Sequence, residues 1–177
     1  MLVRRATIAD IGRLHKLVES AYRGDSAKQG WTHEADLLGG QRTDAAALAA
    51  IITDPKAAIL IVEDGDALIG CVQIASASEG LGYLGLLAVS PTVQAGGIGK
   101  MLIAAAEREL AASFAAVRVE MTVIAARTEL IAYYERRGYH GTGDTRAFPY
   151  GDERFGEPRR EDLHFVVMEK RIRLSKV

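Results

Sequence analysis

Residues 86–102 read LLAVSPTVQAGGIGKML, an apolar strand that ends at Val89 and passes through a glycine-rich turn into a helix. At the start of a helix the first backbone amides have no partner within the helix, and the helix dipole adds partial positive charge. Glycine also lets an anion approach the backbone without meeting a Cβ atom. The stretch therefore predicts a site for a phosphate or pyrophosphate group.

Two common phosphate-binding motifs do not fit this loop. Walker A requires glycine and then serine or threonine where the chain has Gln94 and Met101. The dinucleotide pattern GxGxxG fits Gly97 and Gly99 but finds Leu102 at its third glycine. A turn that only connects a strand to a helix is the alternative reading of the glycines alone.

Outward from this loop, apolar runs of strand length alternate with helical stripes. The expected strands cover residues 2–6, 57–63, 67–74, 81–89, 117–124, 139–145 and 163–169. The expected helices start at Thr7 and at Thr43 or Asp44, and two more cover 97–112 and 128–137. Residues 22–42 lack such a pattern, so we expect a long loop with at most a short helix at 34–38.

Length and charge restrict the class of protein. The 177 residues fit a single domain over 1–177, and 49% hydrophobic residues are enough for a buried core. A formal net charge of -1 argues against a nucleic-acid partner. The N-terminus lacks the apolar stretch of a signal peptide, and the uncharged run 80–99 is too rich in glycine for a membrane helix. We expect a cytoplasmic protein with no membrane partner.

Cysteine and histidine usage argues against a metal site. Cys71 is the one cysteine, so it cannot build a CxxC site or close a disulfide within the chain. It lies in an apolar run without a nearby basic residue, which favours an inert, protonated thiol. The four histidines show no HExxH spacing. We therefore expect no bound metal.

A second segment narrows the interpretation of the glycine loop. The strand RVEMTVIAA (118–126) is followed by a helix that ends in AYYERRGY (132–139). Together, the loop with Gln94, Gly97 and Gly99 and this helix end resemble the signature blocks of the GNAT family of acetyl-CoA-dependent N-acetyltransferases. The order of elements over nearly the whole chain is also similar to that family.

The resemblance implies an α/β (α+β) fold and an enzyme. It implies a mixed, mostly antiparallel central sheet of about seven strands, splayed between the fourth and fifth, with about four helices on its faces. It also implies an acyltransferase that uses acetyl-CoA as cosubstrate and acetylates a primary amine directly in a ternary complex. A homodimer is compatible with the resemblance, although no interface is identified in the sequence.

The resemblance further implies which residues hold acetyl-CoA. The backbone of the strand before the loop pairs with the pantetheine arm, and the loop amides hold the pyrophosphate. The implied cofactor-binding residues are Leu87, Ala88, Val89, Gln94, Ala95, Gly96, Gly97, Ile98, Gly99 and Lys100. Arg127 stands where many members have asparagine, so it either reaches the cofactor or is a solvated neighbour of the helix start.

Tyr134 matches the family's tyrosine beside the thioester sulfur, where a phenol can protonate the departing thiolate. The alternative is that Tyr133 and Tyr134 only pack the helix on the sheet, since aromatic positions on a helix usually belong to the core. The strand 81–89 carries no carboxylate, whereas some members have a general-base glutamate there. Glu34, Asp36 and Glu120 are candidate bases, each with ordinary surface charge as the alternative.

The loop 22–42 is expected to border the acceptor pocket, with Trp31, Glu34 and Arg42 as substrate-binding residues. Trp31 with Glu34 suits a cationic amine, and Arg42 can hold a carboxylate, so we expect a small amine, with amino-acid-like amines among the candidates. Packing of Trp31 onto the core is the alternative. Residues 148–150 are a further candidate wall of the pocket. The rival functions are a non-catalytic acyl-CoA sensor and a protein N-terminal or lysine acetyltransferase.

Overall fold

The computed structural model describes residues 1–93 and 96–173. Within these residues the chain forms a seven-stranded sheet in the order β1-β3-β4-β5-β6-β9-β7, in which only β5 and β6 are parallel neighbours. Its strands are β1 (Leu2–Arg5), β3 (Ala57–Asp64), β4 (Ala67–Ser78), β5 (Leu81–Val89), β6 (Arg118–Ile124), β7 (His140–Ala147) and β9 (His164–Arg171). The mostly antiparallel sheet confirms the expected fold class.

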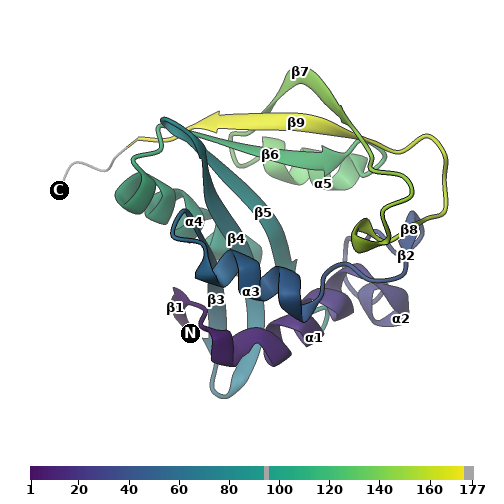
Figure 1. The fold of residues 1–177 in the computed structure, drawn as a ribbon, viewed down its shortest axis with the longest axis horizontal. Helices are drawn as coiled ribbons and strands as arrows, with labels where there is room; N and C mark the ends of the chain where they lie inside the picture. Colours follow the sequence, from purple (N-terminus) through teal and green to yellow (C-terminus); the bar gives the residue numbers. More distant parts are fainter. Residues whose placement is uncertain (94–95, 174–177) are drawn as a thin grey trace.

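Helices cover both faces of this sheet (Figure 1). They are α1 (Ile11–Tyr22), α2 (Gly24–Ala27), α3 (Ala45–Thr53), α4 (Ile98–Phe114) and α5 (Thr128–Glu135), with short 3-10 turns η1 (Ile8–Asp10) and η2 (Glu153–Phe155). A second, two-stranded ladder joins β2 (Leu38–Gly39) to β8 (Glu157–Pro158). Figure 1 shows α1 and α3 in front of the sheet and α4 behind it.

Local chemistry explains the starts of the helices near the N-terminus. Thr7 and Asp10 form a capping box, because the Asp10 carboxylate accepts from the Thr7 amide at 2.8 Å. The Asp44 side chain caps α3 by accepting from the Ala47 amide at 2.7 Å. Both caps were expected from the sequence. The strand β5 has the expected bounds, and its residues alternate between half-buried and buried.

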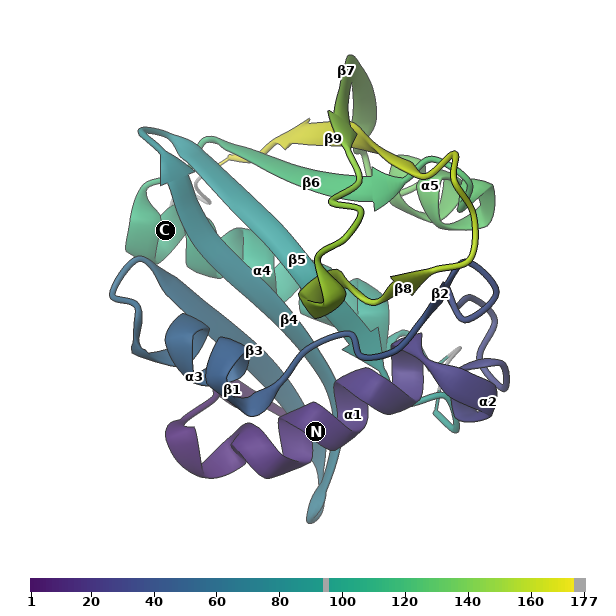
Figure 2. The ribbon, with the colours of Figure 1, turned by 45° about the vertical axis from the view of Figure 1, so that its right-hand side comes forward.

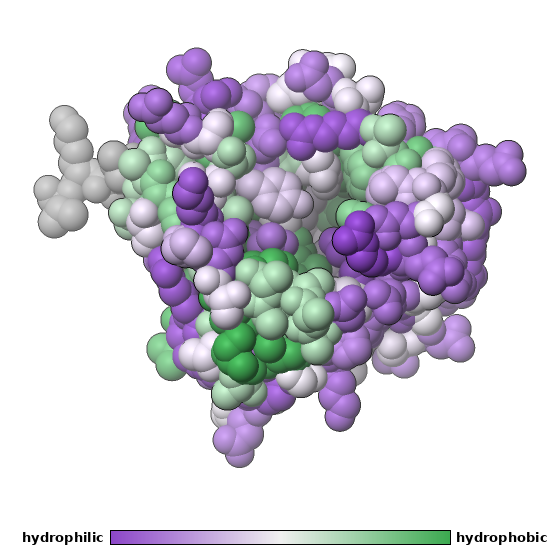
Figure 3. Space-filling model, viewed as in Figure 1, coloured by the Kyte–Doolittle hydropathy of each residue, from purple (hydrophilic) through white to green (hydrophobic). Residues whose placement is uncertain are grey.

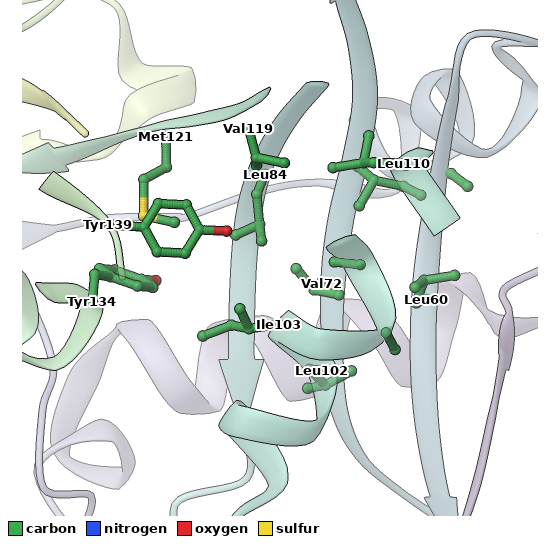
Figure 4. Packing of buried hydrophobic residues seen from close by; sticks show 14 of the residues in the cluster. Leu60, Val72, Leu84, Leu102, Ile103, Leu110, Val119, Met121, Tyr134 and Tyr139 are labelled. Carbon is green, nitrogen blue, oxygen red and sulfur yellow. The ribbon is translucent and has the colours of Figure 1, made fainter. Parts of the chain in front are cut away.

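The core lies on both faces of the sheet. One cluster packs α4 and Tyr134 and Tyr139 against the strands, with Leu102 and Leu110 fully buried (Figure 4). A second cluster packs α1 and α3 against the opposite face, with Leu14 and Leu48 fully buried. Because helices cover both faces, β3 is buried along most of its length instead of alternating.

Residues 34–38 form no helix, where the sequence allowed at most a short one in a long loop. The amides of Leu37 and Leu38 both donate to the Glu34 carbonyl, at 2.9 Å each, so one turn does form. It does not propagate, because Leu38 and Gly39 pair with β8 as a strand. A single turn is too short to be stable without further bonds, and the ladder supplies them instead. The loop 22–42 has its one short helix earlier, at α2.

Candidate functional site

Strands β5 and β6 pair only over residues 81–83 and 118–120, and they diverge beyond these residues (Figures 1 and 2). Leu86 has a positive φ of 47°, and the register between β4 and β5 shifts beside it. Such a bulge bends a strand and disrupts its ladder locally. From residue 84 to residue 88, the edge of β5 that faces β6 pairs with no strand of the described chain. Its backbone is therefore placed to bind an extended ligand.

The glycine loop leads from the end of β5 to the start of α4. Gly97 caps α4 with φ +77°, a left-handed conformation that favours glycine, and a Cβ built on it would meet open space. The amides of Ile98, Gly99 and Lys100 belong to the first turn of this 17-residue helix, where no intrahelical acceptor exists. Gly96 and Lys100 are exposed beside them. Gln94 and Ala95 lie outside the described residues.

A cavity of about 230 Å³, the smaller cavity, joins the glycine loop to the open edge of β5. Its lining combines the end of β5, the start of α4, one side of α5 and part of the loop after α1. The lining residues include Leu87, Ala88, Val89, Gly97, Ile98, Gly99, Trp31, Thr32, Arg127, Tyr133, Tyr134 and Arg137. The structure thus brings most of the expected cofactor-binding residues into one place.

An aromatic wall closes one side of the smaller cavity. The rings of Trp31 and Tyr133 lie 5.1 Å apart between centroids, and the Arg137 guanidinium lies 3.4 Å from the Tyr133 ring centroid. A Cβ on Gly99 would come within 2.6 Å of the Tyr133 hydroxyl, so glycine is needed for this close approach. Trp31 therefore lines the smaller cavity together with Gly97 and Gly99 and is not among the lining residues of the larger cavity.

A second cavity of about 500 Å³, the larger cavity, opens between the diverging halves of the sheet. Figure 3 shows the surface hollowed on the face that α1 and α3 cover. Its apolar lining includes Phe148, Pro149 and Phe165, so residues 148–149 stand where a pocket wall was expected. The two cavities share five lining residues, which are Tyr22, Leu87, Arg127, Leu130 and Tyr134. They therefore meet beside the open edge of β5.

Tyr134 stands at this meeting point. It is buried, with 6% of its surface exposed, and it packs edge-on against Tyr133 and Tyr139. Burial raises the pKa of its phenol well above the usual range. The phenol therefore stays protonated at neutral pH. Tyr22, on α1, donates a hydrogen bond to the Leu87 carbonyl on β5, and burial raises its pKa to about 12.

Glu34 is enclosed by arginines. Arg127 donates to one carboxylate oxygen at 3.2 Å, Arg23 donates to the other, and the Nε of Arg42 lies 3.8 Å away. Burial by itself favours the neutral acid, but the three guanidinium groups outweigh burial and lower the pKa of Glu34. An ionised carboxylate that already serves several cations is a poor proton acceptor.

The other two candidate bases also have cationic partners. Asp36 is well exposed and lies 3.4 Å from the ammonium of Lys28. Glu120 accepts a hydrogen bond from Arg146 at 3.1 Å. Neither residue lines one of the two cavities in the described chain. We assign the role of general base to none of the three carboxylates.

Cys71 is buried on β4, where its thiol contacts the Leu86 carbonyl at 3.6 Å. Burial raises the pKa of this thiol to about 12. A protonated thiol of this kind is a weak nucleophile, as the sequence predicted. This burial argues against Cys71 as an acyl carrier.

Three residues of the site were not predicted from the sequence: Tyr22, Arg23 and Arg137. Tyr22 ends α1 and Arg23 follows it, and both line the larger cavity. Arg137 lines the smaller cavity and lies over the Tyr133 ring. Arg137 could have been found, because it follows Tyr133 by one helical turn and so shares its face. No local signal marks Tyr22 or Arg23, whose partners Leu87 and Glu34 are brought to them by the fold.

Two other kinds of feature are absent from residues 1–93 and 96–173. No group of three or more histidine, cysteine, aspartate or glutamate side chains is arranged to hold a metal ion there. No described helix is long and apolar enough to cross a membrane.

Comparison with known proteins gives a consistent result. The model of the acetyltransferase (GNAT) family matches residues 15–139. No sequence among curated proteins matches the chain.

Solved structures with similar folds include three acetyltransferases. A ribosomal-protein-alanine N-acetyltransferase from Brucella melitensis is 20% identical, with a TM-score of 0.69 over 97% of this chain and 100% of that one. A GNAT-family acetyltransferase from Streptococcus pneumoniae is 17% identical, with a TM-score of 0.66 over 97% and 99%. A GNAT-family acetyltransferase from Elizabethkingia anophelis, with acetyl-CoA bound, is 16% identical, with a TM-score of 0.56 over 66% and 77%.

Proposed function

The chain belongs to the acetyltransferase (GNAT) family and is an acyltransferase, and from this premise we propose that it transfers acetyl from acetyl-CoA directly to a primary amine of a small molecule. One observation carries the proposal. Two cavities with different linings meet beside the open edge of β5, and Tyr134 belongs to both. Such an arrangement lets a donor and an acceptor approach the same point from opposite sides.

The smaller cavity suits the donor. Its pyrophosphate would be held by the first-turn amides of α4, Ile98, Gly99 and Lys100, with the loop residues Gly96 and Gly97 beside them. The amide-bearing arm would run along Leu87, Ala88 and Val89, which lie beyond the residues where β5 pairs with β6. The open space at Gly97 supports this fit, because a side chain there would stand over the loop.

The acetyl thioester supplies a carbonyl carbon that a neutral amine can attack. A new N–C bond forms, the C–S bond breaks, and one amine proton leaves to water. Tyr134 donates its phenolic proton to the departing sulfur and regains a proton from solvent. An amide on the open edge of β5 stabilises the oxyanion that forms during attack.

The larger cavity suits the acceptor. It is about twice as large as the smaller cavity, it is open to the surface, and Phe148 and Phe165 give it apolar walls. A small amine with an apolar part would fill such a space. The arginines in its lining limit which other chemical groups the acceptor can have.

Two rival functions are separated from this proposal by one assay. Purified protein is mixed with acetyl-CoA and a panel of small amines, and released CoA is measured with a thiol reagent. Amine-dependent release supports the proposed transfer. If the protein binds acetyl-CoA but no amine or peptide causes release of CoA, the protein is a sensor. Release only with peptides would instead favour a protein acetyltransferase, the activity named for the Brucella melitensis structure.

A further inference from the structure

The larger cavity has a positively charged lining in the described chain. Its charged lining residues are Arg23, Arg42, Arg127, Arg146 and Glu34. Arg146 has a carboxylate partner outside the cavity, Glu120, at 3.1 Å. The remaining three arginines share one carboxylate, although the chain as a whole has a net charge of -1. The positive charge is therefore concentrated at this site.

Two of these arginines are buried with unused donors. The side chains of Arg23 and Arg127 are 5% and 7% exposed. The Nε and Nη2 of Arg23 and the Nε of Arg127 have no hydrogen-bond partner among the described residues. A buried guanidinium donor without an acceptor costs free energy. Both arginines line the larger cavity and keep positive charge that the described residues compensate only in part, so an anionic ligand there would be attracted to them.

Other acidic residues near the cluster compensate little of this charge. Glu129 lies 4.0 Å from the Nε of Arg127, but its side chain is 48% exposed and it accepts from Thr32. Glu19 accepts from the amides of Arg42 and Thr43 and does not line the larger cavity. Solvent screens the exposed carboxylate far more than it screens the buried arginines.

We propose that the acceptor carries an anionic group, a carboxylate or a phosphate, in addition to its amine, and that Arg23, Arg42 and Arg127 bind this group. Arginine suits both anions because its planar fork donates two parallel hydrogen bonds. Glu34 then serves to hold the arginines in place and does not bind the amine. The inference rests on the proposed acetyl transfer, and it also predicts that the cavity rejects polycationic amines.

Linear primary amines of two to five methylenes test this directly. Each length is compared with four ends: a carboxylate, a phosphate, a carboxamide and a second ammonium group. We expect kcat/KM for the anionic members to exceed that of the carboxamide by about 10- to 100-fold, because charge-assisted bonds to arginine are lost with the amide. The diammonium members should be the poorest. The carboxylate and phosphate arms show which anion the cavity takes.

Variants of Arg42 locate the effect, because Arg42 is the most exposed of the three arginines. Arg42→Gln should lower the preference for the anionic members at least about tenfold, and Arg42→Glu should shift it toward the diammonium members. The affinity for acetyl-CoA should not change in either. Arg118→Gln is the control, because Arg118 pairs with Glu169 at the opposite end of β6. An equal loss in this control would overturn the assignment to the cluster.

Calorimetry of the same amines with the CoA-loaded protein separates this inference from the proposed function. If no amine releases CoA but the anionic members still bind more tightly, the anion site holds and the proposed transfer fails. If amines release CoA without regard to the charge at their far end, the transfer holds and the anion site is refuted. If anionic members neither bind nor react better than carboxamides, the inference is likewise refuted.

Discussion

At the scale of single residues, Tyr134 is the proposed general acid. Its hydroxyl belongs to a buried phenol whose pKa is raised by burial, so the proton is present over the whole physiological range. The alkaline side of a pH–rate profile should therefore not report its ionisation. The rate should rise with pH instead, as the acceptor amine loses its proton.

Replacing Tyr134 with phenylalanine removes this proton and little else. Tyr134→Phe should lower kcat by about 10²- to 10⁴-fold, the usual contribution of a general acid, with acetyl-CoA affinity nearly unchanged. Steady-state kinetics and calorimetry measure the two quantities. The matched control is Tyr139→Phe, because the Tyr139 hydroxyl bonds to Glu107 at 2.9 Å and does not line either cavity. Unchanged turnover in Tyr134→Phe would contradict the assignment.

A substitution at Gly97 tests whether the glycine loop binds the pyrophosphate of acetyl-CoA. Gly97→Val places a side chain over the loop, so acetyl-CoA binding should weaken by about 10- to 100-fold, as when charge-assisted hydrogen bonds are lost. Its φ of +77° also strains any other residue. Gly65→Val is the control, since Gly65 has φ +58° and open space too but lies in the turn between β3 and β4. Equal Kd values for acetyl-CoA in both variants would argue against the loop as its site.

At the scale of elements, Glu34 ties the loop after α1 to the start of α5. Removing one partner of a buried ion pair leaves the other charge uncompensated. Glu34→Gln should therefore lower the free energy of unfolding by about 3–5 kcal/mol at pH 7, measured by urea denaturation. Asp36→Asn, on the same loop but exposed, should cost no more than about 1 kcal/mol. A loss of similar size in both variants would contradict this role of Glu34.

The pH dependence of this difference follows from the lowered pKa of Glu34. A carboxylate with a lowered pKa in the folded state adds stability above its ordinary pKa of 4.5. That stability is lost as the pH falls through the folded-state value. The gap between the wild-type protein and Glu34→Gln should therefore be full at pH 7 and shrink in acid. A gap that stays constant in acid would contradict an ionised Glu34.

Much of the element pattern was predictable because its causes are local. The apolar run of β5, the caps at Thr7 and Asp44 and the glycine loop all follow from neighbouring residues. No helix forms at 34–38, because β8, more than a hundred residues later, pairs with Leu38 and Gly39. The arginine cluster was hidden for the same reason, since Glu34 and Arg127 are 93 positions apart.

At the scale of the whole molecule, the divergence of the sheet creates the site. Three residue pairs over 81–83 hold β5 to β6, and beyond them the two strands diverge (Figure 2). Two cavities that share Tyr134 in their linings lie at this divergence. Sequence resemblance predicted this splay between the fourth and fifth strands. The resemblance also implied that Trp31 borders the acceptor pocket, which stays a prediction; in the folded chain Trp31 packs on Tyr133 and lines the smaller cavity.

A crystal structure of the protein with acetyl-CoA would show directly whether the glycine loop and Tyr134 bind the donor. We expect the pyrophosphate within hydrogen-bond distance of the amides of Ile98, Gly99 and Lys100, and the thioester sulfur beside the Tyr134 hydroxyl. Acetyl-CoA bound away from the start of α4, or with its sulfur far from Tyr134, would contradict this expectation.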